Sequence, residues 1–261
     1  MDLHLEGKLA VVTGASKGIG LAVTTALAEE GAIVVAGART MSEELCRLVA
    51  TQSVHAVSVD LATTDGPAEF IEQAVDRLGG VNVLINNVGA VRPRTGGFQS
   101  ITDDDWIASL TIDLLAAVRA TRAALPHLVE RGGAIVNVCS VNAFLPDPLV
   151  MDYSAAKGAL ANFSKALSKE VGSKGVRVNT VSPGPVATDL WLGKGGVAAT
   201  VASAGGVEPE TVANRAALDM VTGRFTRPEQ VADLVIFLAS DRASNVTGAD
   251  FVIDGGMTTT L

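Results

Sequence analysis

The sequence predicts an α/β fold in which helices cover both faces of one doubly wound parallel sheet of about seven strands. Short apolar runs of strand length alternate with segments of helix length along the chain. The runs are rich in Val, Ile and Ala with little polar alternation, which is typical of parallel strands buried on both faces. Glycine-rich or polar motifs follow several of these runs, at the strand ends where such sheets bind ligands.

Punctuating residues set the bounds of the elements in order. The first apolar run leads through a glycine-rich turn to a helical segment that Gly31 ends. A later, long helix begins after Thr102, because the hydroxyl can cap it and the three aspartates that follow suit the positive end of a helix. The predicted strands are 9–13, 32–38, 54–60, 81–86, 134–139, 176–181 and 251–253. The predicted helices are 19–30, 66–78, the long helix carrying Trp106, Leu110, Leu114 and Val118, 151–171 and 230–238.

Bulk properties narrow the function classes. A chain of 261 residues without a Ser-, Pro- or charge-rich linker or an internal repeat fits one domain, 1–261. The net charge of −8 argues against a nucleic-acid partner, since such binding depends on phosphate neutralisation by Lys and Arg. No apolar run has the length of a membrane span and the N-terminus lacks a signal-peptide pattern, so we expect a cytoplasmic protein without a membrane partner. Cys46 and Cys139 form no CxxC pair, and no metal site is predicted.

The turn after the first strand has the pattern of a nucleotide site. Gly14, Gly18 and Gly20 follow residues 9–13 with the spacing GxxxGxG and open the next helix. Glycine lets the backbone turn tightly, so that a pyrophosphate can reach the helix N-terminus, where free N–H groups and the helix dipole favour anions. The position of this motif predicts a bound dinucleotide.

The end of the second strand indicates which dinucleotide is bound. An acidic residue there would hold the ribose hydroxyls of NAD, but Ala38 occupies the position and Arg39 follows it. A guanidinium can bind a 2′-phosphate through a fork of two hydrogen bonds, and Lys17 adds a second positive charge nearby. The pattern favours NADP(H) over NAD(H). The alternative is that both cations are solvated surface groups.

Three residues in the second half of the chain form a candidate reaction centre. Tyr153, the only tyrosine, precedes Lys157 by one helical turn, so their polar ends lie on one helix face. Ser140 lies thirteen residues before Tyr153, directly after a predicted strand. A phenol can donate a proton to a carbonyl oxygen, but its ordinary pKa of about 10 requires help, and a nearby ammonium lowers that pKa. Ser140 can hydrogen-bond the same oxygen.

In this order and spacing, the motifs resemble those of the short-chain dehydrogenase/reductase family over essentially the whole chain, and in particular 3-oxoacyl-carrier-protein reductases. The resemblance implies a single Rossmann domain that transfers hydride between a nicotinamide and a ketone or secondary alcohol. It also implies a homotetramer formed through the helices that hold 106–131 and 151–171, together with the last strand.

The resemblance assigns further cofactor contacts. Asp60 and the amide of Leu61 would hold the adenine, although Asp60 could instead be an exposed turn cap. The run 86–89, which resembles the family's NNAG, would shape the wall beside the ribose, and 183–188 would hold the nicotinamide carboxamide. The cofactor set is Gly14, Ser16, Lys17, Gly18, Ile19, Gly20, Arg39, Asp60, Leu61, Asn87, Gly89, Tyr153, Lys157, Pro183, Gly184, Val186 and Thr188.

One position departs from the family pattern. Where the family has an Asn whose backbone carbonyl holds a water next to the lysine, this chain has Asp113. The carbonyl survives the change but the side-chain donors do not, and an ionised Asp113 would favour a charged Lys157. We therefore include Asp113 with Ser140, Tyr153 and Lys157 as catalytic candidates.

The substrate side is the least determined part. Residues 189–226, rich in Gly and Ala, correspond to the family's substrate lid, and 92–94 form a possible second rim. The expected substrate contacts are Ser140, Asn142, Tyr153 and Trp191, although Trp191 could equally anchor the lid core. A small-molecule carbonyl or alcohol is expected.

Other functions stay open at this point. Arg131 and Lys174 fall where carrier-protein reductases have two basic residues that bind the acidic carrier, which would favour a 3-oxoacyl thioester. Small ketones, sugars, steroids and polyketide-like carbonyls are alternatives. A dinucleotide-binding regulator without chemistry, or a structural subunit, is the other class, and the intact Ser140, Tyr153 and Lys157 favour the enzyme.

Overall fold

The computed structural model describes residues 1–260, which form one seven-stranded parallel sheet in the order β3-β2-β1-β4-β5-β6-β7. The predicted fold class is therefore confirmed. The strands are β1 Leu9–Thr13, β2 Ile33–Ala38, β3 Val54–Ser58, β4 Val83–Asn86, β5 Ala134–Val138, β6 Arg177–Pro183 and β7 Asp250–Ile253. The α-helices are α1 Gly18–Glu29, α2 Glu43–Thr51, α3 Gly66–Leu78, α4 Asp103–Leu110, α5 Ala116–Arg131, α6 Met151–Val171, α7 Asp189–Leu192, α8 Val197–Gly205, α9 Pro209–Leu218 and α10 Pro228–Ala239.

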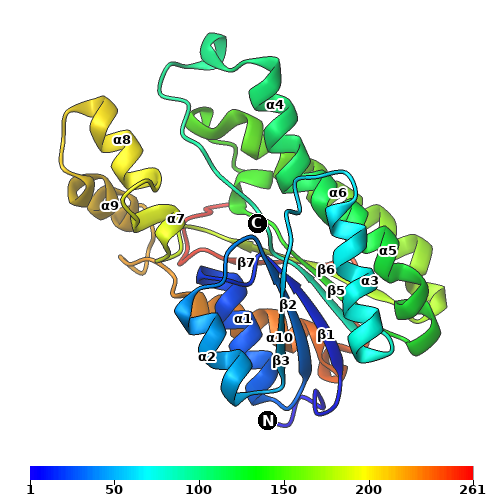
Figure 1. The fold of residues 1–261 in the computed structure, drawn as a ribbon. Helices are drawn as coiled ribbons and strands as arrows, with labels where there is room; N and C mark the ends of the chain where they lie inside the picture. The colour runs from blue at the N-terminus through cyan, green and yellow to red at the C-terminus, as the bar shows by residue number, and fades with distance from the viewer. Residues whose placement is uncertain (261) are drawn as a thin grey trace.

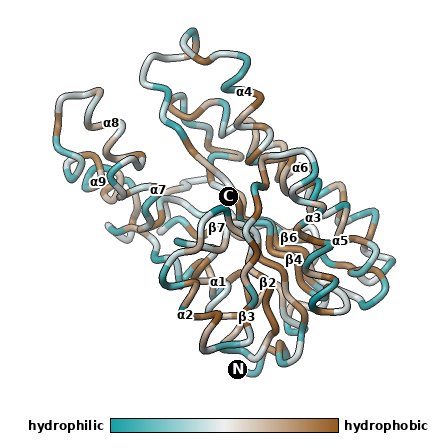
Figure 2. Tube along the Cα trace, viewed as in Figure 1, coloured by the Kyte–Doolittle hydropathy of each residue, from teal (hydrophilic) through white to brown (hydrophobic). Residues whose placement is uncertain are grey.

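Helices cover the sheet on both faces, with α1, α2 and α10 on one side and α3, α5 and α6 on the other (Figure 1). Successive strand residues point to opposite faces, so each strand contributes to two cores. In β1, Val12 packs in the cluster that contains Leu27 of α1, whereas Val11 packs with Phe70 and Leu128 on the opposite face. Figure 2 shows the strands as the most hydrophobic part of the trace. This two-sided burial explains the lack of polar alternation in the sequence.

The strand order reverses between β1 and β4, which places a crevice at their carboxyl ends. Asn87, directly after β4, ties the two strands together there. Its amide nitrogen donates to the carbonyl oxygens of Thr13 and Gly14, both at 3.0 Å, and its backbone N–H donates to the hydroxyl of Thr13 at 2.9 Å. These hydrogen bonds therefore hold the glycine-rich turn against the start of the loop after β4.

The long helix after Thr102 is present but is interrupted. Thr102 caps α4 as expected, because its hydroxyl accepts from the amide of Asp105 at 3.2 Å while the Asp105 carboxylate accepts from the amide of Thr102 at 3.1 Å. Between α4 and α5, residues Thr111–Leu115 form a π-helical turn. Such turns often occur at functional sites.

Two parts of the helical structure were not predicted. Helix α2 follows β2, and α7, α8 and α9 lie within residues 189–226, where a Gly- and Ala-rich lid was expected without any predicted helix. Figure 1 shows α7–α9 beyond the carboxyl ends of the strands, on the side opposite α4. Among residues 1–260, no helix combines the length and the apolar character needed to cross a bilayer.

Candidate active site

A cavity of about 1220 Å³ opens at the carboxyl ends of the strands. This volume exceeds the roughly 300–1,000 Å³ of a pocket for one small ligand, so the cavity has room for a dinucleotide and a second molecule. Its lining includes the glycine-rich turn and residues of α7, α8 and α9, and the start of α7 lies beside the turn. Every predicted site residue lines it except Gly20 and Asp113, which lie directly behind its wall.

The glycine-rich turn has the geometry that a pyrophosphate needs. Gly14 and Gly18 have φ values of +66° and +56°, in the left-handed region that favours glycine. A Cβ on Gly20 would lie 2.2 Å from the carbonyl oxygen of Gly14, so this position admits no side chain. Helix α1 begins at Gly18, and no side chain caps its N-terminus. The first N–H groups of the helix are thus available to an anion in the cavity.

The end of the cavity beside the carboxyl end of β2 carries the two predicted cations. Lys17 and Arg39 both line the cavity and are exposed there. The Lys17 ammonium lies 3.7 Å from the carboxylate of Asp189, and both side chains are 70% exposed. Asp60 lines the same end, and its carboxylate also accepts from the amide of Ala62 at 2.9 Å. Asp60 therefore caps its turn, as the alternative interpretation held, while remaining available at the cavity wall.

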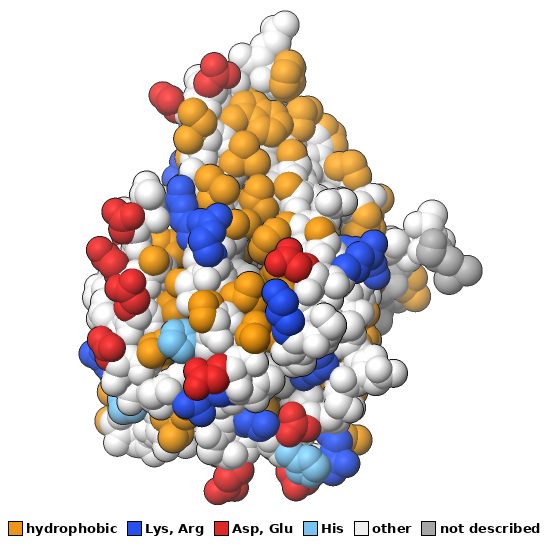
Figure 3. All heavy atoms as spheres, turned by 90° about the vertical axis from the view of Figure 1, so that its right-hand side faces the viewer, with side chains coloured by type: hydrophobic (Ala, Val, Ile, Leu, Met, Phe, Trp, Pro, Cys, Tyr) orange, Lys and Arg blue, Asp and Glu red, His pale blue; other side chains and the backbone are white. Residues whose placement is uncertain are grey.

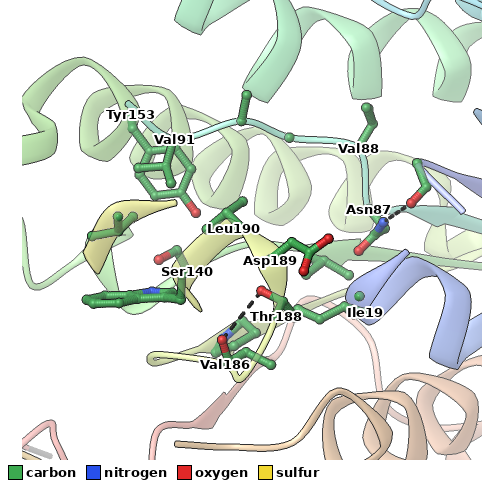
Figure 4. Close-up of a pocket in the computed structure, with 18 of the residues that line it drawn as sticks. Ile19, Asn87, Val88, Val91, Ser140, Tyr153, Val186, Thr188, Asp189 and Leu190 are labelled. Atoms are coloured by element: carbon green, nitrogen blue, oxygen red, sulfur yellow. Dashed lines mark hydrogen bonds between the residues drawn. The ribbon is translucent and has the colours of Figure 1, made fainter. Parts of the chain in front are cut away.

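Ser140 and Tyr153 come together at the middle of the cavity, where Ser140 follows β5 and Tyr153 lies in the first turn of α6. Figure 4 shows the Tyr153 hydroxyl pointing toward Ser140. Lys157 is buried beneath them, with its ammonium 5.6 Å from the centre of the Tyr153 ring and donating to the carbonyl oxygen of Val138 at 3.0 Å. The sequence spacing thus produces the expected cluster.

The pKa values in this cluster differ in one respect from expectation. Burial raises the pKa of Tyr153, and although Lys157 lowers it as predicted, the net direction is upward. For Lys157, burial lowers the pKa, but Tyr153, Asp113 and Cys139 together raise it above its ordinary value. The predicted effect of Lys157 on the pKa of Tyr153 is therefore present, but the effect of burial, which the sequence does not reveal, outweighs it. At neutral pH Tyr153 carries its proton and Lys157 its charge.

Asp113 lies in the π-helical turn and is 1% exposed. One carboxylate oxygen accepts from the amide of Ala90 at 3.0 Å, and the other has no hydrogen-bond partner among the described residues. Burial raises the pKa of Asp113 to about 7, against the opposing effect of Lys157. A Cβ on Gly89 would lie 2.7 Å from the Asp113 carboxylate and 3.5 Å from the Lys157 ammonium, so both groups approach Gly89.

Sequence reasoning missed a buried ion pair beside Tyr153. Arg94, expected on the rim of the pocket, instead turns inward and its side chain is only 12% exposed. Its guanidinium binds Asp152, the residue before Tyr153, and also Asp105 at 2.8 Å. Ser109 donates to the same Asp152 oxygen at 2.6 Å. These partners are far apart in sequence, and the only signal was a charged residue next to Tyr153.

The pKa shifts show that this pair is ionised. Burial alone would raise the pKa of Asp152, but the hydrogen bonds from Arg94 and Ser109 outweigh burial and hold it below its ordinary value. The bond to Asp152 raises the pKa of Arg94 in turn. Three segments, the loop after β4, α4 and the start of α6, are therefore joined by charge next to Tyr153.

The predicted substrate residues also lie at the cavity. Trp191 lines it and at the same time packs edge-to-face on Phe225, with ring centres 5.4 Å apart, so it anchors the lid while its contact with a substrate stays a prediction. Asn142 lines the wall and accepts from the Ser140 hydroxyl at 3.2 Å.

Arg131, one of the two cations expected to bind a carrier protein, lies elsewhere. It ends α5 just before β5 and donates to the carbonyl oxygen of Gly79 at 2.8 Å, at the amino edge of the sheet.

Comparisons with known proteins agree on a family. The sequence model of the family described as short chain dehydrogenase matches residues 8–196. The chain is 33% identical over 261 residues to the 3-oxoacyl-(acyl-carrier-protein) reductase FabG of Thermotoga maritima, covering 98% of this chain and 99% of that protein. It is 31% identical over 258 residues to the meso-2,3-butanediol dehydrogenase of Serratia marcescens, covering 98% and 96%.

A solved structure gives a similar result. The crystal structure of L-sorbose reductase from Gluconobacter frateurii, complexed with NADPH and L-sorbose, matches with a TM-score of 0.91 and 33% identity over 100% of both chains. The named substrates of these proteins differ in size, polarity and charge. The comparisons therefore narrow the reaction more than they narrow the substrate.

Proposed function

The chain belongs to the short-chain dehydrogenase family, and from that premise we propose that it is an NADP(H)-dependent oxidoreductase interconverting a ketone and a secondary alcohol, with Tyr153 as general acid and base. The observation that carries the proposal is the position of Ser140, Tyr153 and Lys157 in one cavity with the glycine-rich turn. A regulator without chemistry would not need a buried lysine beneath a tyrosine that faces the cavity.

The cofactor would lie along the strand ends. When bound, NADPH supplies the hydride that the carbonyl carbon accepts. The uncapped start of α1, with Gly14, Ser16, Gly18, Ile19 and Gly20, would bind the pyrophosphate. The remaining contacts would be Lys17 and Arg39 on the 2′-phosphate, Asp60 and Leu61 on the adenine, Asn87 and Gly89 beside the ribose, Lys157 on the nicotinamide ribose, and Pro183, Gly184, Val186 and Thr188 at the carboxamide.

The preference for NADP(H) has two supports. Ala38 rather than an acidic residue ends β2, so no carboxylate there repels a 2′-phosphate, and Arg39 follows it. The similar L-sorbose reductase structure contains NADPH.

The chain's own groups would handle the proton. Ser140 orients the carbonyl oxygen, and the O–H bond of Tyr153 breaks as its proton bonds to that oxygen while the carbon gains hydride. The Lys157 ammonium stabilises the phenolate that remains. The raised pKa of Tyr153 keeps it protonated at neutral pH, which suits the reductive direction. Asp113, when ionised, would raise the pKa of Lys157 and so favour its charged form.

A carrier-protein thioester is the second candidate, because of the similarity to FabG of Thermotoga maritima. The thioester hypothesis relied on Arg131 and Lys174 as the cations that bind the acidic carrier protein. In a single chain, both residues lie far from the cavity. Arg131 is engaged with Gly79 at the amino edge of the sheet, opposite the cavity, and Lys174 lies just before β6 at the same edge.

The proposal includes the architecture. The chain would act as one domain, with 189–226 as a lid formed by α7–α9 and Trp191 on its cavity side. A homotetramer would use the face of α4, α5 and α6, where Figure 3 shows apolar side chains gathered over the upper half. Ile107 of α4 is 61% exposed, and Leu115 of the π-helical turn that leads into α5 is 37% exposed.

The test is consumption of NADPH and of NADH against a broad panel of ketones and aldehydes. We expect turnover with NADPH preferred. Tight NADPH binding without turnover of any carbonyl would favour the regulator, and preferred use of NADH would contradict the roles of Lys17 and Arg39.

A further inference from the structure

The substrate end of the cavity has a distinct chemical character. We call it the outer chamber, bounded by the lining residues within 90–93, 141–150 and 190–219. It lies next to Ser140 and Tyr153, and Figure 4 shows Val91 and Leu190 beside them. Whatever surrounds the reacting carbonyl must fit against these segments.

The walls of the outer chamber are aliphatic by construction. Val197 and Val201 of α8 are four residues apart, as are Val212 and Ala216 of α9, so each pair lies on one helix face, and both faces line the chamber. On α7, the contact with Phe225 holds Trp191 in place at the wall.

The chamber also leaves large apolar side chains in contact with solvent. Leu145, Leu149 and Leu190 line it and are 42%, 39% and 40% exposed. Exposed apolar side chains gathered in one place mark interaction surfaces or ligand-binding grooves, and the position of these three inside the cavity favours a ligand. A substrate with a bulky apolar group would bury this surface.

Charge in the chamber disfavours anions. Its charged lining side chains are one cation, Arg92, and two carboxylates, Asp147 and Asp219. Arg94, the neighbouring cation, is neutralised by Asp152 and Asp105. A phosphate- or carboxylate-bearing substrate would meet a surplus of negative charge.

Hydrogen-bonding groups for a polyol are few. The uncharged polar side chains of the chamber lining are Asn142 and the indole N–H of Trp191. The Asn142 amide already accepts from Ser140 and donates to the carbonyl oxygen of Leu145 at 3.3 Å. Away from these groups and the charged side chains of Arg92, Asp147 and Asp219, hydroxyl groups against the aliphatic walls would lose water without gaining partners, which is costly.

We propose that the outer chamber selects a neutral ketone bearing a bulky apolar group, such as an aryl or branched alkyl group, over polyols and over anionic thioesters. The inference rests on the proposed function, because it presupposes that the cavity reduces a ketone. The inference adds the chemical class of the ketone to the proposed reaction.

The test compares three probes at saturating NADPH: 4-phenyl-2-butanone, L-sorbose and acetoacetyl coenzyme A. The expected kcat/KM for the phenyl ketone exceeds that for either other probe by about tenfold or more, from burial of its apolar surface. A higher kcat/KM for L-sorbose or for the thioester leaves the proposed function standing and overturns the inference. No turnover of any probe by protein that binds NADPH contradicts the proposed function itself.

A pair of variants on α9 locates the effect. Val212→Asp places a charge in the chamber, whereas Leu218→Asp, at a 79% exposed position outside the lining, is the matched control. We expect kcat/KM for the phenyl ketone to fall about tenfold in the first and stay unchanged in the second, with NADPH affinity unchanged in both. Val212→Thr, close in shape, should give a smaller fall and guards against misfolding. Equal kcat/KM in all three variants and the native protein would overturn the inference.

Discussion

The carboxyl group of Asp113 lies buried behind the cavity wall, where it shares the space around Gly89 with Lys157. Its pKa of about 7 in the folded protein compares with 3.8 as the ordinary value. Between these two values the folded chain binds a proton that the unfolded chain has released. The stabilisation of the fold by this proton is therefore complete below about pH 4. It decreases as the pH rises from about 4 and is lost above about 7.

The variant Asp113→Asn should remove this dependence. From pH 5 to pH 7, the native protein should lose up to about 1.4 kcal/mol of unfolding free energy per pH unit relative to the variant. Urea unfolding of both proteins at a series of pH values measures the difference. Parallel pH profiles would show that Asp113 titrates as in the unfolded chain.

Arg39 is the residue on which cofactor choice depends in the proposal. Replacing it with Asp removes the fork for the 2′-phosphate and supplies a carboxylate for ribose hydroxyls. The ratio of kcat/KM for NADPH to that for NADH should fall by about tenfold or more, since hydrogen bonds to charged groups contribute about 1.5–3 kcal/mol. Arg77→Asp, at an exposed site on α3 outside the cavity lining, is the control. An unchanged ratio in Arg39→Asp would refute the role.

Single residues were predictable where chemistry fixes their spacing. Tyr153 and Lys157 lie close together because a helix places positions four residues apart on the same face. The turn after β1 needs a positive φ at position 14, which favours glycine there. The net pKa of Tyr153 was not predictable, because burial depends on the whole surrounding fold. The same holds for Arg94, whose inward direction is set by Asp152, 58 residues away.

At the scale of elements, the Arg94–Asp152 pair joins the loop after β4 to the start of α6. The two side chains are 12% and 2% exposed, so removing one partner leaves a buried charge. The carboxylate also holds Ser109 of α4. The register of Tyr153 relative to the cavity therefore depends on a charge contact between three segments.

Removing one member of this pair should destabilise the protein strongly. Arg94→Ala should lower the unfolding free energy by about 3–5 kcal/mol, and the double variant with Asp152→Ala should cost less than the sum of the single changes. Arg47→Ala breaks the exposed pair with Glu44, whose side chains are 72% and 58% exposed, and should change stability by at most about 1 kcal/mol. Urea unfolding measures all four. Equal effects at both pairs would show that the buried contact is not special.

Elements with strong local signals were predictable. The strands were found within a few residues because buried parallel strands are continuous apolar runs, and the start of α4 because Thr102 and Asp105 form a capping box. Helices α7–α9 were missed because Gly and Ala carry little periodicity, and their apolar faces line a cavity rather than a core. The π-helical turn has no signature in the local sequence. Its Asp113 side chain accepts a hydrogen bond from the amide of Ala90, 23 residues away, so the contact depends on the tertiary fold.

At the scale of the whole molecule, the apolar face of α4–α6 is where the proposed tetramer would form. Ile107→Asp should shift the protein toward smaller species, because a charge at a 61% exposed apolar position would be buried on association. Val49→Asp, 41% exposed on α2, should leave the assembly unchanged. Light scattering after size-exclusion chromatography measures both. A native protein that is monomeric, or a tetramer unaffected by Ile107→Asp, would contradict the proposed interface.

The fold brings the glycine-rich turn, Tyr153 and the outer chamber to the carboxyl edge of one sheet. The most direct test of their joint function is to compare NADPH binding and ketone reduction in the native protein and in Tyr153→Phe. The variant should bind NADPH with about native affinity and reduce ketones more slowly by a factor of about 10²–10⁴. Ketone reduction at the native rate in Tyr153→Phe would contradict the assignment of Tyr153 as the acid.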